Sequence, residues 1–376
     1  MSAELIPTDP DSLGQALDAL EGVDDLRAKL NGQQAWLVGG AVRDLLLGGS
    51  RADLDVVVEG DAAAVAALLG AESKAHERFG TASVEVAGVR VDIAAARRET
   101  YSHPGALPEV EPASLSDDLE RRDFTVNAMA LPLSGEAELI DPHGGKADLE
   151  AGVLRVLHPG SFEDDPTRAL RAARYAARLG LDLEPETAKL LQAADLSTVS
   201  VDRVDAELAR LLAEESAPGA LELLAKWGLA GIDEGAPDRA RAARERLADP
   251  AWAELVGGAD AMSEAARPSE GTRRAVAALT RRIPQRPSEG MAVAAGFRPV
   301  ELLMARIASA EWLDEWASEW SHVTLEITGD DLMEAGVAQG PAVGRGLGAA
   351  LAARLDGEIS TREEQLRVAL AAAAAT

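Results

Sequence analysis

Residues 36–61 read WLVGGAVRDLLLGGSRADLDVVVEGD, and this stretch decides the fold to be expected. The apolar run 36–38 is typical of a short buried strand, and it ends at the pair Gly39-Gly40. Residues 41–47 have the apolar content of a helix. After a second glycine turn, residues 53–58 are dominated by β-branched side chains, which predicts another strand.

Two features of this stretch point to chemistry. Residues two apart on a strand share a face, so Asp53 and Asp55 are expected to point the same way, with Leu54 and Val56 in the core. A glycine turn at a helix N-terminus favours phosphate, and paired carboxylates favour divalent metal ions. Together they indicate a nucleotide that is handled through its phosphates by metal ions. The alternatives are an ordinary turn and a solvated strand face, because the glycines match neither a dinucleotide fingerprint nor a P-loop.

Composition sets the limits on function. A chain of 376 residues can hold two or more domains, and no apolar run is long enough for a transmembrane helix. The first ten residues lack the pattern of a secretory signal, and the absence of cysteine excludes disulfides and thiolate zinc sites. A cytoplasmic enzyme is therefore expected. The net charge of −27 argues against a nucleic-acid partner, but binding depends on local patches, and most basic residues are arginines, which suit phosphate.

The rest of the N-terminal part alternates helices and strands. Residues 11–30 predict an amphipathic helix broken near Gly22, and residues 61–69 predict a second helix. The alternating stretches 82–86 and 89–93, joined at Ala87-Gly88, predict a hairpin. Asp92 lies on its second strand.

Residues 97–118 contain three prolines and a glycine, and we expect an irregular loop there. A loop of that length is usually functional or mobile. A turn at 141–145 closes the α/β portion near residue 150.

Beyond residue 150 the pattern becomes helical. Asp165-Pro166 is typical of a helix start, and four arginines then follow along one side of the helix at positions 168, 171, 174 and 178. They predict a phosphate or nucleotide contact, or else a solvated face paired with acids. The five histidines are scattered, so a histidine metal centre and a Ser-His-Asp site are not expected. After Pro185 only helices are expected.

Three segments resemble a known family. They are GGAVRD at 39–44 together with DLD at 53–55, RRDFTVNAM at 121–129, and DDPTRALRAARY at 164–175. In order and spacing they are similar to the class II tRNA nucleotidyltransferases (CCA-adding enzymes) and the bacterial poly(A) polymerases, over about residues 30–215. A weaker similarity lies at 327–332 with Gly340-Pro341.

The resemblance implies an architecture. Residues 1–150 would form an α+β nucleotidyltransferase head with a mixed sheet like that of DNA polymerase beta. An all-α remainder would follow, with a neck at 151–215 for nucleobase recognition, a body at 216–325 and a tail at 326–376 that binds tRNA. The loop 97–118 would be the family's flexible loop, which helps to switch from C to A addition.

The resemblance also implies roles for single residues. Asp53 and Asp55 would hold two Mg²⁺ ions, with Asp92 as a third acidic residue nearby. Phosphate, sugar and base would be bound by Gly39, Gly40, Arg43, Arg122, Asp123, Asn127, Asp165 and Arg168, with Arg171 and Arg174 beside them. Asp165 and Arg168 would read the Watson–Crick edge of C or A, because arginine offers a fixed fork of donors and aspartate only acceptors. Asp164 stands where the family often has Glu, and Tyr175 where Phe is common.

The implied function is Mg²⁺-dependent addition of C, C and A from CTP and ATP to the acceptor end of tRNA, without a nucleic-acid template. The alternatives are an A-adding enzyme of a split CC/A system, a poly(A) polymerase, and an inactive RNA-binding module. A small-molecule nucleotidyltransferase would not need the arginine helix or the long helical remainder. The arginine-rich stretch 267–298 is proposed as an RNA-backbone contact, with a solvated helix surface as the alternative.

Overall fold

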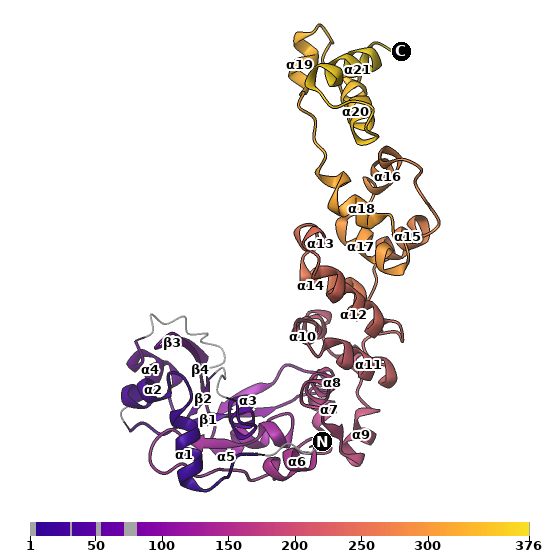
Figure 1. Ribbon diagram of the computed structural model, residues 1–376. Coiled ribbons are helices and arrows are strands. Elements are labelled where there is room, and N and C mark those ends of the chain that lie inside the picture. The colour runs from indigo at the N-terminus through magenta and orange to yellow at the C-terminus, as the bar shows by residue number, and fades with distance from the viewer. Residues whose placement is uncertain (1–4, 31, 50–53, 71–80, 376) are drawn as a thin grey trace. The chain divides into compact units, whose positions relative to one another are not determined.

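The computed structural model describes residues 5–30, 32–49, 54–70 and 81–375. The chain divides into two compact units, Met1–Ser216 and Ala217–Thr376 (Figure 1). The first unit joins the predicted head and neck, and the second joins the predicted body and tail. Each unit is described by itself below.

A five-stranded mixed sheet forms the base of the first unit. Its order is β3-β4-β2-β1-β7, where only the pair β2 and β4 is parallel. The strands are β1 (Ala35–Val38), β2 (Leu54–Val58), β3 (Thr81–Val86), β4 (Val89–Ala95) and β7 (Ala130–Pro132). The predicted mixed-sheet head followed by helices is confirmed.

Glycine turns separate the elements of this sheet as the sequence predicts. The N-terminal helix breaks into α1 (Pro10–Asp18) and α2 (Val23–Leu30), with Gly22 at a φ of +81° between them. Helix α3 (Gly40–Leu46) follows β1, and α4 (Ala62–Leu68) follows β2. Ala87 and Gly88 both have positive φ, which suits the tight turn between β3 and β4.

The prediction of an irregular loop over residues 97–118 is wrong in its larger part. Strands β5 (Arg97–Thr100) and β6 (Glu109–Pro112) pair as a hairpin, and α5 (Leu115–Glu120) follows. The hairpin lacks the apolar alternation by which strands are recognised, because charged residues occupy most of its positions, and Arg98 and Glu111 are register partners across it. Pro112 stands at the end of an edge strand, where proline is tolerated. Residues 101–108 and 113–114 lie outside these elements.

Helix α5 packs on the face of the sheet that carries Asp55. Leu115 and Leu119 are buried against Val38 and Val57 in one apolar cluster. Val57 and Asp55 are two apart on β2 and therefore share this face. The packing of α5 thus brings the residues after its C-terminus, 121–127, towards the carboxylate of Asp55.

Helices complete the first unit. They are α6 (Gly145–Ala151), α7 (Ser161–Asp164), α8 (Arg168–Leu179), α9 (Pro185–Leu191) and α10 (Val201–Ala213), with 3-10 turns at Thr125–Asn127 and Leu196–Thr198. A short parallel pair, β8 (Val153–Leu154) and β9 (Asp182–Leu183), lies among them. Helix α8 ends at Gly180, which has a φ of +66°, a common stop for a helix.

The second unit contains only helices among its described residues. They are α11 (Ala217–Trp227), α12 (Ala236–Leu247), α13 (Pro250–Leu255), α14 (Gly258–Ala266), α15 (Glu270–Leu279), α16 (Pro287–Ala294), α17 (Pro299–Ala308), α18 (Leu313–Ser318), α19 (Gly329–Glu334), α20 (Pro341–Leu355) and α21 (Arg362–Ala374), with a 3-10 turn at Trp320–His322. Helices α19, α20 and α21 share a small core around Ile327, Leu332 and Ala350. In the described part of the chain, no helix combines the length and apolar character needed to cross a bilayer.

Candidate functional site

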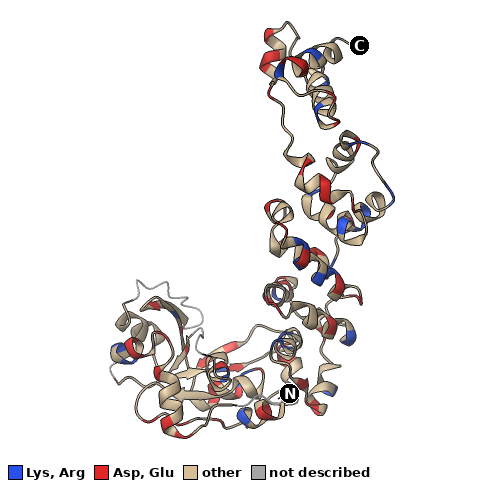
Figure 2. Cartoon of the chain, in the orientation of Figure 1, with Lys and Arg blue, Asp and Glu red and all other residues tan. Residues whose placement is uncertain are grey.

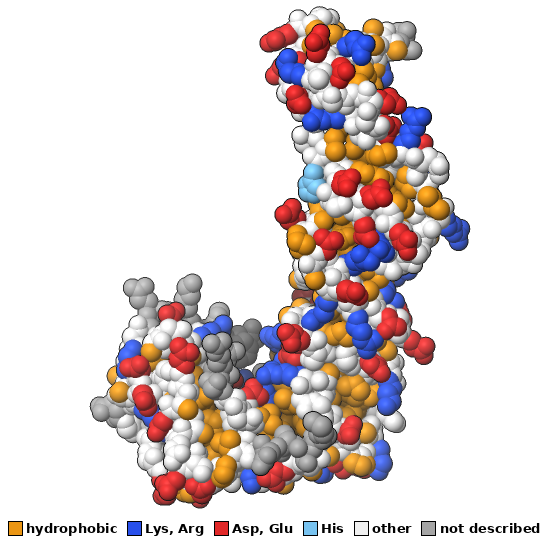
Figure 3. Space-filling view, in the orientation of Figure 1, with side chains coloured by type: hydrophobic (Ala, Val, Ile, Leu, Met, Phe, Trp, Pro, Cys, Tyr) orange, Lys and Arg blue, Asp and Glu red, His pale blue; other side chains and the backbone are white. Residues whose placement is uncertain are grey.

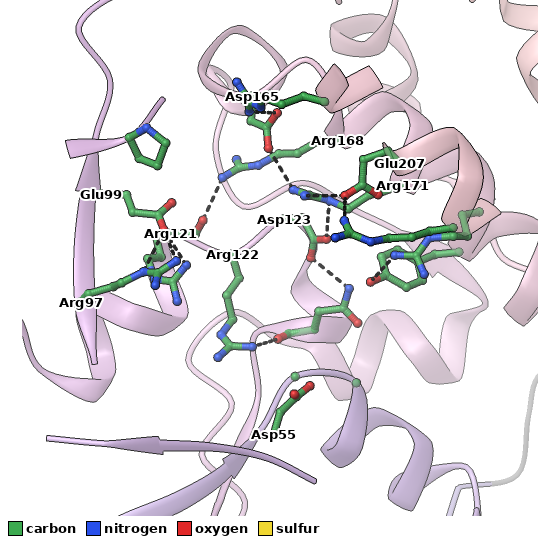
Figure 4. A pocket seen from close by; sticks show the side chains of 18 of the residues that line it. Asp55, Arg97, Glu99, Arg121, Arg122, Asp123, Asp165, Arg168, Arg171 and Glu207 are labelled. Atoms are coloured by element: carbon green, nitrogen blue, oxygen red, sulfur yellow. Dashed lines mark hydrogen bonds and ion pairs between the residues drawn. The ribbon is translucent and has the colours of Figure 1, made fainter. Parts of the chain in front are cut away.

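A cavity of about 690 Å³ lies in the first unit (Figure 4). Eight arginines and five carboxylates line it, an excess of positive charge in a chain whose net charge is −27. Its walls come from α3, β2, the β5–β6 hairpin, residues 121–127, α8 and α10. The lining residues are Gly39, Gly40, Asp55, Arg97, Glu99, Tyr101, Pro108, Arg121, Arg122, Asp123, Asn127, Asp165, Arg168, Arg171, Arg174, Tyr175, Arg203, Glu207 and Arg210.

Most residues singled out in the sequence lie around this cavity. The lining includes Gly39, Gly40, Asp55, Arg122, Asp123, Asn127, Asp165, Arg168, Arg171 and Arg174. Arg43 and Asp92 lie outside the lining set. Asp53, the predicted metal ligand, lies outside the residues that the structure describes. Segments more than a hundred residues apart in the sequence thus meet at one site.

The turn at Gly39 allows Arg122 to reach the start of α3. Gly39 has φ of +67° and ψ of −130°, which L side chains rarely adopt. A Cβ atom at this position would stand 2.6 Å from Nη1 of Arg122. Nε and Nη2 of Arg122 both donate to Oδ2 of Asp118, which is fully buried. The guanidinium therefore has little freedom to move away.

We expect Gly39→Ala to lower nucleotide affinity about tenfold or more and stability by about 1–3 kcal/mol. The added methyl group displaces Arg122 and strains the backbone. Gly48→Ala is the matched control, because Gly48 also has positive φ, +79°, but a Cβ there would touch nothing within 4 Å. Urea unfolding and titration with a nucleoside triphosphate measure the two effects. Equal nucleotide affinities in the two variants would contradict the role given to the close contact.

Arg43 lies behind the cavity lining and supports Asn127. Its side chain is buried, its Nη1 donates to Oδ1 of Asn127, and its Nε donates to Asp44 at 2.8 Å. Asn127 in turn donates to Oδ1 of Asp123 at 2.9 Å. This structure therefore holds Arg43 behind Asn127, and a direct phosphate contact of Arg43 stays a prediction.

Asp55 and Asp92 stand side by side in the sheet. They are register partners on the parallel strands β2 and β4, so their side chains leave the same face. Asp92 accepts from Nε of Arg90 at 3.1 Å and from the hydroxyl of Ser83. Carboxylate oxygens are the donors that Mg²⁺ prefers, so this pair and the neighbouring Asp53 fit a magnesium site in donor chemistry. No group of three carboxylate or imidazole side chains is close enough to hold a metal ion within the described ranges, which exclude Asp53.

Arg171 forms the centre of the ion pairs at the opposite end of the cavity (Figure 4). Its nitrogens lie 3.2 Å from Asp123, 3.3 Å from Asp165 and 3.9 Å from Glu207. Burial works against charge on Asp123, but Arg171 and the hydrogen bond from Asn127 outweigh it and lower the pKa of that carboxyl. Burial likewise opposes charge on Arg171, yet the surrounding carboxylates raise its pKa. Asp123 and Arg171 are therefore both charged at neutral pH.

Arg168 is buried in the same wall. Its Nη1 donates to the hydroxyl of Ser161, and its Nη2 donates to the backbone oxygen of Arg121 at 2.8 Å. Among the described atoms, its Nε has no hydrogen-bond partner. Arg168 is thus fixed in place and keeps one donor group available.

The wall made by the hairpin is not predicted by the sequence motifs. Glu99 accepts from Arg97, from Nη1 of Arg121 at 2.9 Å and from the hydroxyl of Tyr101 at 2.9 Å. Burial and the charge of Glu99 raise the pKa of Tyr101, which therefore stays a neutral donor. The chain has only two tyrosines, Tyr101 and Tyr175, and both line the cavity. Their rarity in an aromatic-poor chain was a signal that could have found the hairpin wall.

Helix α10 supplies the second missed wall. Arg203 donates to Oδ1 of Asp165 at 3.0 Å and to the backbone oxygen of Gly105 at 2.9 Å. Glu207 and Arg210 form an ion pair one and two turns further along. The spacing of four and three residues places all three on one helix face, a pattern that is visible in the sequence.

The arginine-rich stretch in the second unit is on the surface. Seven arginines are exposed at positions 267, 273, 274, 281, 282, 286 and 298. Arg298 pairs with Glu264 and Glu301, and Arg286 with Glu358. Acidic and basic residues are interspersed over the helices of this unit (Figures 2 and 3). An RNA contact at this stretch remains a proposal.

The chain is similar to known proteins in sequence and in fold. Residues 35–155 match the family described as the poly A polymerase head domain. The chain is 43% identical over 215 residues to the A-adding tRNA nucleotidyltransferase of Halalkalibacterium halodurans, covering 54% of this chain and 50% of that protein. It is 45% identical over 210 residues to the CC-adding tRNA nucleotidyltransferase of Deinococcus radiodurans, covering 54% and 56%. The aligned part spans about half the length of these relatives.

The likeness to solved structures extends further along the chain. The Thermotoga maritima CCA-adding enzyme complexed with tRNA shares the fold with a TM-score of 0.72 and 26% identity. The alignment covers 96% of each chain. The helical second unit is therefore part of the shared fold, although the sequence similarity to the two bacterial relatives covers only about half of this chain.

Proposed function

We propose that this chain adds C, C and A to the 3' end of tRNA. The premise is that its poly A polymerase head domain places it in the family of tRNA nucleotidyltransferases and poly(A) polymerases. The nucleotides would come from CTP and ATP, and pyrophosphate would leave. No nucleic-acid template is needed in this proposal, because protein side chains select the base.

One observation carries the proposal. A single cavity combines Gly39, Asp55 and Arg122 at one end with Asp165 and Arg168 at the other (Figure 4). The first end suits a triphosphate, because a glycine turn and a guanidinium favour anions. The second end suits the edge of a base, because it presents a carboxylate acceptor and a guanidinium donor in fixed positions. A small-molecule nucleotidyltransferase has no need of the second end.

The intermediate residues would hold the sugar. Asn127 donates a hydrogen bond to Asp123 and accepts one from Arg43, which fixes its side chain. Arg171 and Arg174 would neutralise charge on the nucleotide while they hold the wall of the cavity. Arg174 lies 4.6 Å from the ring centroid of Tyr175, which keeps that ring in one orientation.

Asp53 and Asp55, with Asp92 nearby, would hold two Mg²⁺ ions. Bound Mg²⁺ lowers the pKa of an attacking hydroxyl and stabilises the charge of a leaving pyrophosphate. The chain's own contribution is to orient the triphosphate at Gly39-Gly40 and to place the 3' hydroxyl of the RNA beside Asp55. The seven exposed arginines at 267–298 would contact the backbone of tRNA, a substrate that the Thermotoga enzyme binds.

An A-adding enzyme is the second candidate, because an A-adding relative is 43% identical to this chain. A CC-adding relative is equally similar, so identity alone does not decide. A poly(A) polymerase and an inactive RNA-binding module remain further alternatives. The test uses tRNA ending at the discriminator base, at -C and at -CC, with single labelled nucleotides. Extension of all three by the expected nucleotide supports CCA addition, whereas extension of only the -CC substrate would establish the A-adding alternative.

We expect Arg168→Ala to blur the choice between C and A by about tenfold or more. Triphosphate affinity should change by less, because the guanidinium faces the base end of the cavity. Competition between CTP and ATP on each tRNA substrate measures the selectivity. Arg178→Ala is the control, since Arg178 is on the same helix and pairs with Asp44 outside the cavity lining. Unchanged selectivity in Arg168→Ala would remove Arg168 from the base-reading pair.

A further inference from the structure

Glu207 has a buried carboxylate oxygen that nothing in the described protein satisfies. The side chain is 7% exposed and lines the cavity from α10. Its Oε1 pairs with Arg210 and lies 3.9 Å from Arg171. Its Oε2 is buried and has no hydrogen-bond partner among the described atoms. A buried acceptor of this kind is costly unless a ligand supplies the missing donor.

The chemistry of the cavity restricts what this donor is. Phosphate oxygens carry only acceptors and negative charge, so a carboxylate repels them. The nucleotide's remaining donors are its ribose hydroxyls and the amino group of its base. In the proposed function the ribose lies at Asp123 and Asn127. Arg171 pairs with Asp123 through Nε and with Glu207 through Nη1, so Glu207 contacts a different nitrogen of the same guanidinium.

Glu207 belongs to the base end of the cavity. Arg171 joins it to Asp165, whose Oδ1 already accepts from Thr167 and Arg203 and whose Oδ2 pairs with Arg171. Figure 4 shows Glu207 beside Arg171, with Asp55 at the opposite end of the view. An acceptor with an open lone pair at this end is suited to an amino group on the nucleobase.

We infer that Oε2 of Glu207 accepts a hydrogen bond from the exocyclic amino group of the incoming C or A. This inference rests on the proposed function and adds a specificity-determining residue to it. Cytosine and adenine carry an amino group at the corresponding edge, whereas uracil and guanine carry a carbonyl oxygen that a carboxylate repels. Glu207 therefore acts against UTP and GTP as well as in favour of CTP and ATP.

The test is a thermodynamic cycle in binding affinity that combines one substitution in the protein with one change in the ligand. Dissociation constants in the presence of Mg²⁺ are measured for CTP and for the analogue in which hydrogen replaces the 4-amino group, on the full chain and on Glu207→Ala. Loss of the amino group should weaken binding to the wild-type protein, and this penalty should shrink about tenfold or more in Glu207→Ala. A penalty that is the same in both proteins overturns the inference and leaves Glu207 as a support for Arg171.

Glu214→Ala is the matched control. Glu214 follows the same helix and pairs with Arg174, but it does not line the cavity. The penalty for loss of the amino group should remain at its wild-type value there. If Glu207→Ala does not fold, Glu207→Gln replaces it. Its amide can donate to the 4-oxygen of uracil, so the preference for CTP over UTP should fall about tenfold, and an unchanged preference overturns the inference.

The readout separates this inference from the proposed function. Nucleotide affinity is measured without tRNA, so the cycle gives a result whether or not the protein extends RNA. Failure to extend any tRNA substrate would remove the proposed function while coupling at Glu207 still stood. Extension of tRNA without coupling would remove only the role of Glu207.

Discussion

Asp55→Asn is expected to lower nucleotide incorporation by about a thousandfold or more while tRNA affinity stays within a fewfold of the wild-type value. Asp55 faces the cavity from β2, on the face where α5 packs. The change removes the negative charge that a metal ion needs and keeps the shape of the side chain. RNA binding depends on cationic groups, so the loss of one carboxylate should not weaken it.

The matched control for Asp55 is Glu85→Gln. Glu85 is an exposed carboxylate on β3 of the same sheet, and its register partner is Arg90. Incorporation should remain at the wild-type rate in this variant. Single-turnover extension of labelled tRNA measures the rate, and a filter-binding titration measures the affinity. Asp53→Asn is predicted to behave as Asp55→Asn does, and turnover in either variant would refute the metal assignment.

Arg171→Ala is expected to destabilise the first unit by about 3 kcal/mol at neutral pH. The substitution leaves Asp123, Asp165 and Glu207 close together without their shared counter-charge. This loss of stability is at the low end of the range for a broken buried ion pair, because the side chain of Arg171 retains 22% exposure. Urea unfolding followed by tryptophan fluorescence and circular dichroism measures the loss. Arg178→Ala, which breaks an exposed ion pair on the same helix, should cost less than about 1 kcal/mol.

The effect of Arg171→Ala should depend on pH in a defined direction. The pKa of Asp123 in the folded protein is lowered below its ordinary value of 3.8, with Arg171 as the main opposing charge to burial. Its ionisation therefore stabilises the wild-type protein fully above that value, and the contribution is lost as the pH falls below it. Without Arg171 the pKa of Asp123 rises, so the stability difference between variant and wild type should narrow towards acid pH. A difference that is constant from pH 7 to pH 3 would contradict this coupling.

The sequence predicted the parts of the fold that depend on local pattern. Strands β1 and β2, the hairpin of β3 and β4, the break at Gly22 and the helical remainder follow from apolar periodicity and from glycine at turns. The charged β5–β6 hairpin could not be predicted in this way, because its charged side chains pair with residues outside the hairpin, as Glu99 does with Arg121 and Arg98 with Asp117.

 The contact between Glu99 and Arg121 joins residues 22 positions apart, and no local sequence pattern predicts it.

The residues of the candidate site likewise divide into those that sequence motifs predicted and those that only the fold brings to the cavity. Gly39, Asp55, Arg122, Asp165 and Arg168 stand out in short motifs, and the cavity includes all five. Further lining residues come from α10 and from the hairpin, outside every motif that the sequence offered. They were missed because a charged residue on a helix face is usually solvated, and only its partners show that it is not.

The sequence by itself determined that glycine turns, paired carboxylates and an arginine helix exist in this chain, because these depend on residue type and on spacing along one element. Only the tertiary structure decided which of them share a cavity. The packing of α5 on the sheet brings Arg122 and Asp123 to Asp55, and the ion pairs of Arg171 bring α8 and α10 to the same site. The tertiary structure also decided that Arg43 holds Asn127 from behind the cavity lining, and that Oε2 of Glu207 is a buried acceptor without a donor among the described atoms. Burial and pairing arise between distant segments, so local pattern cannot supply them.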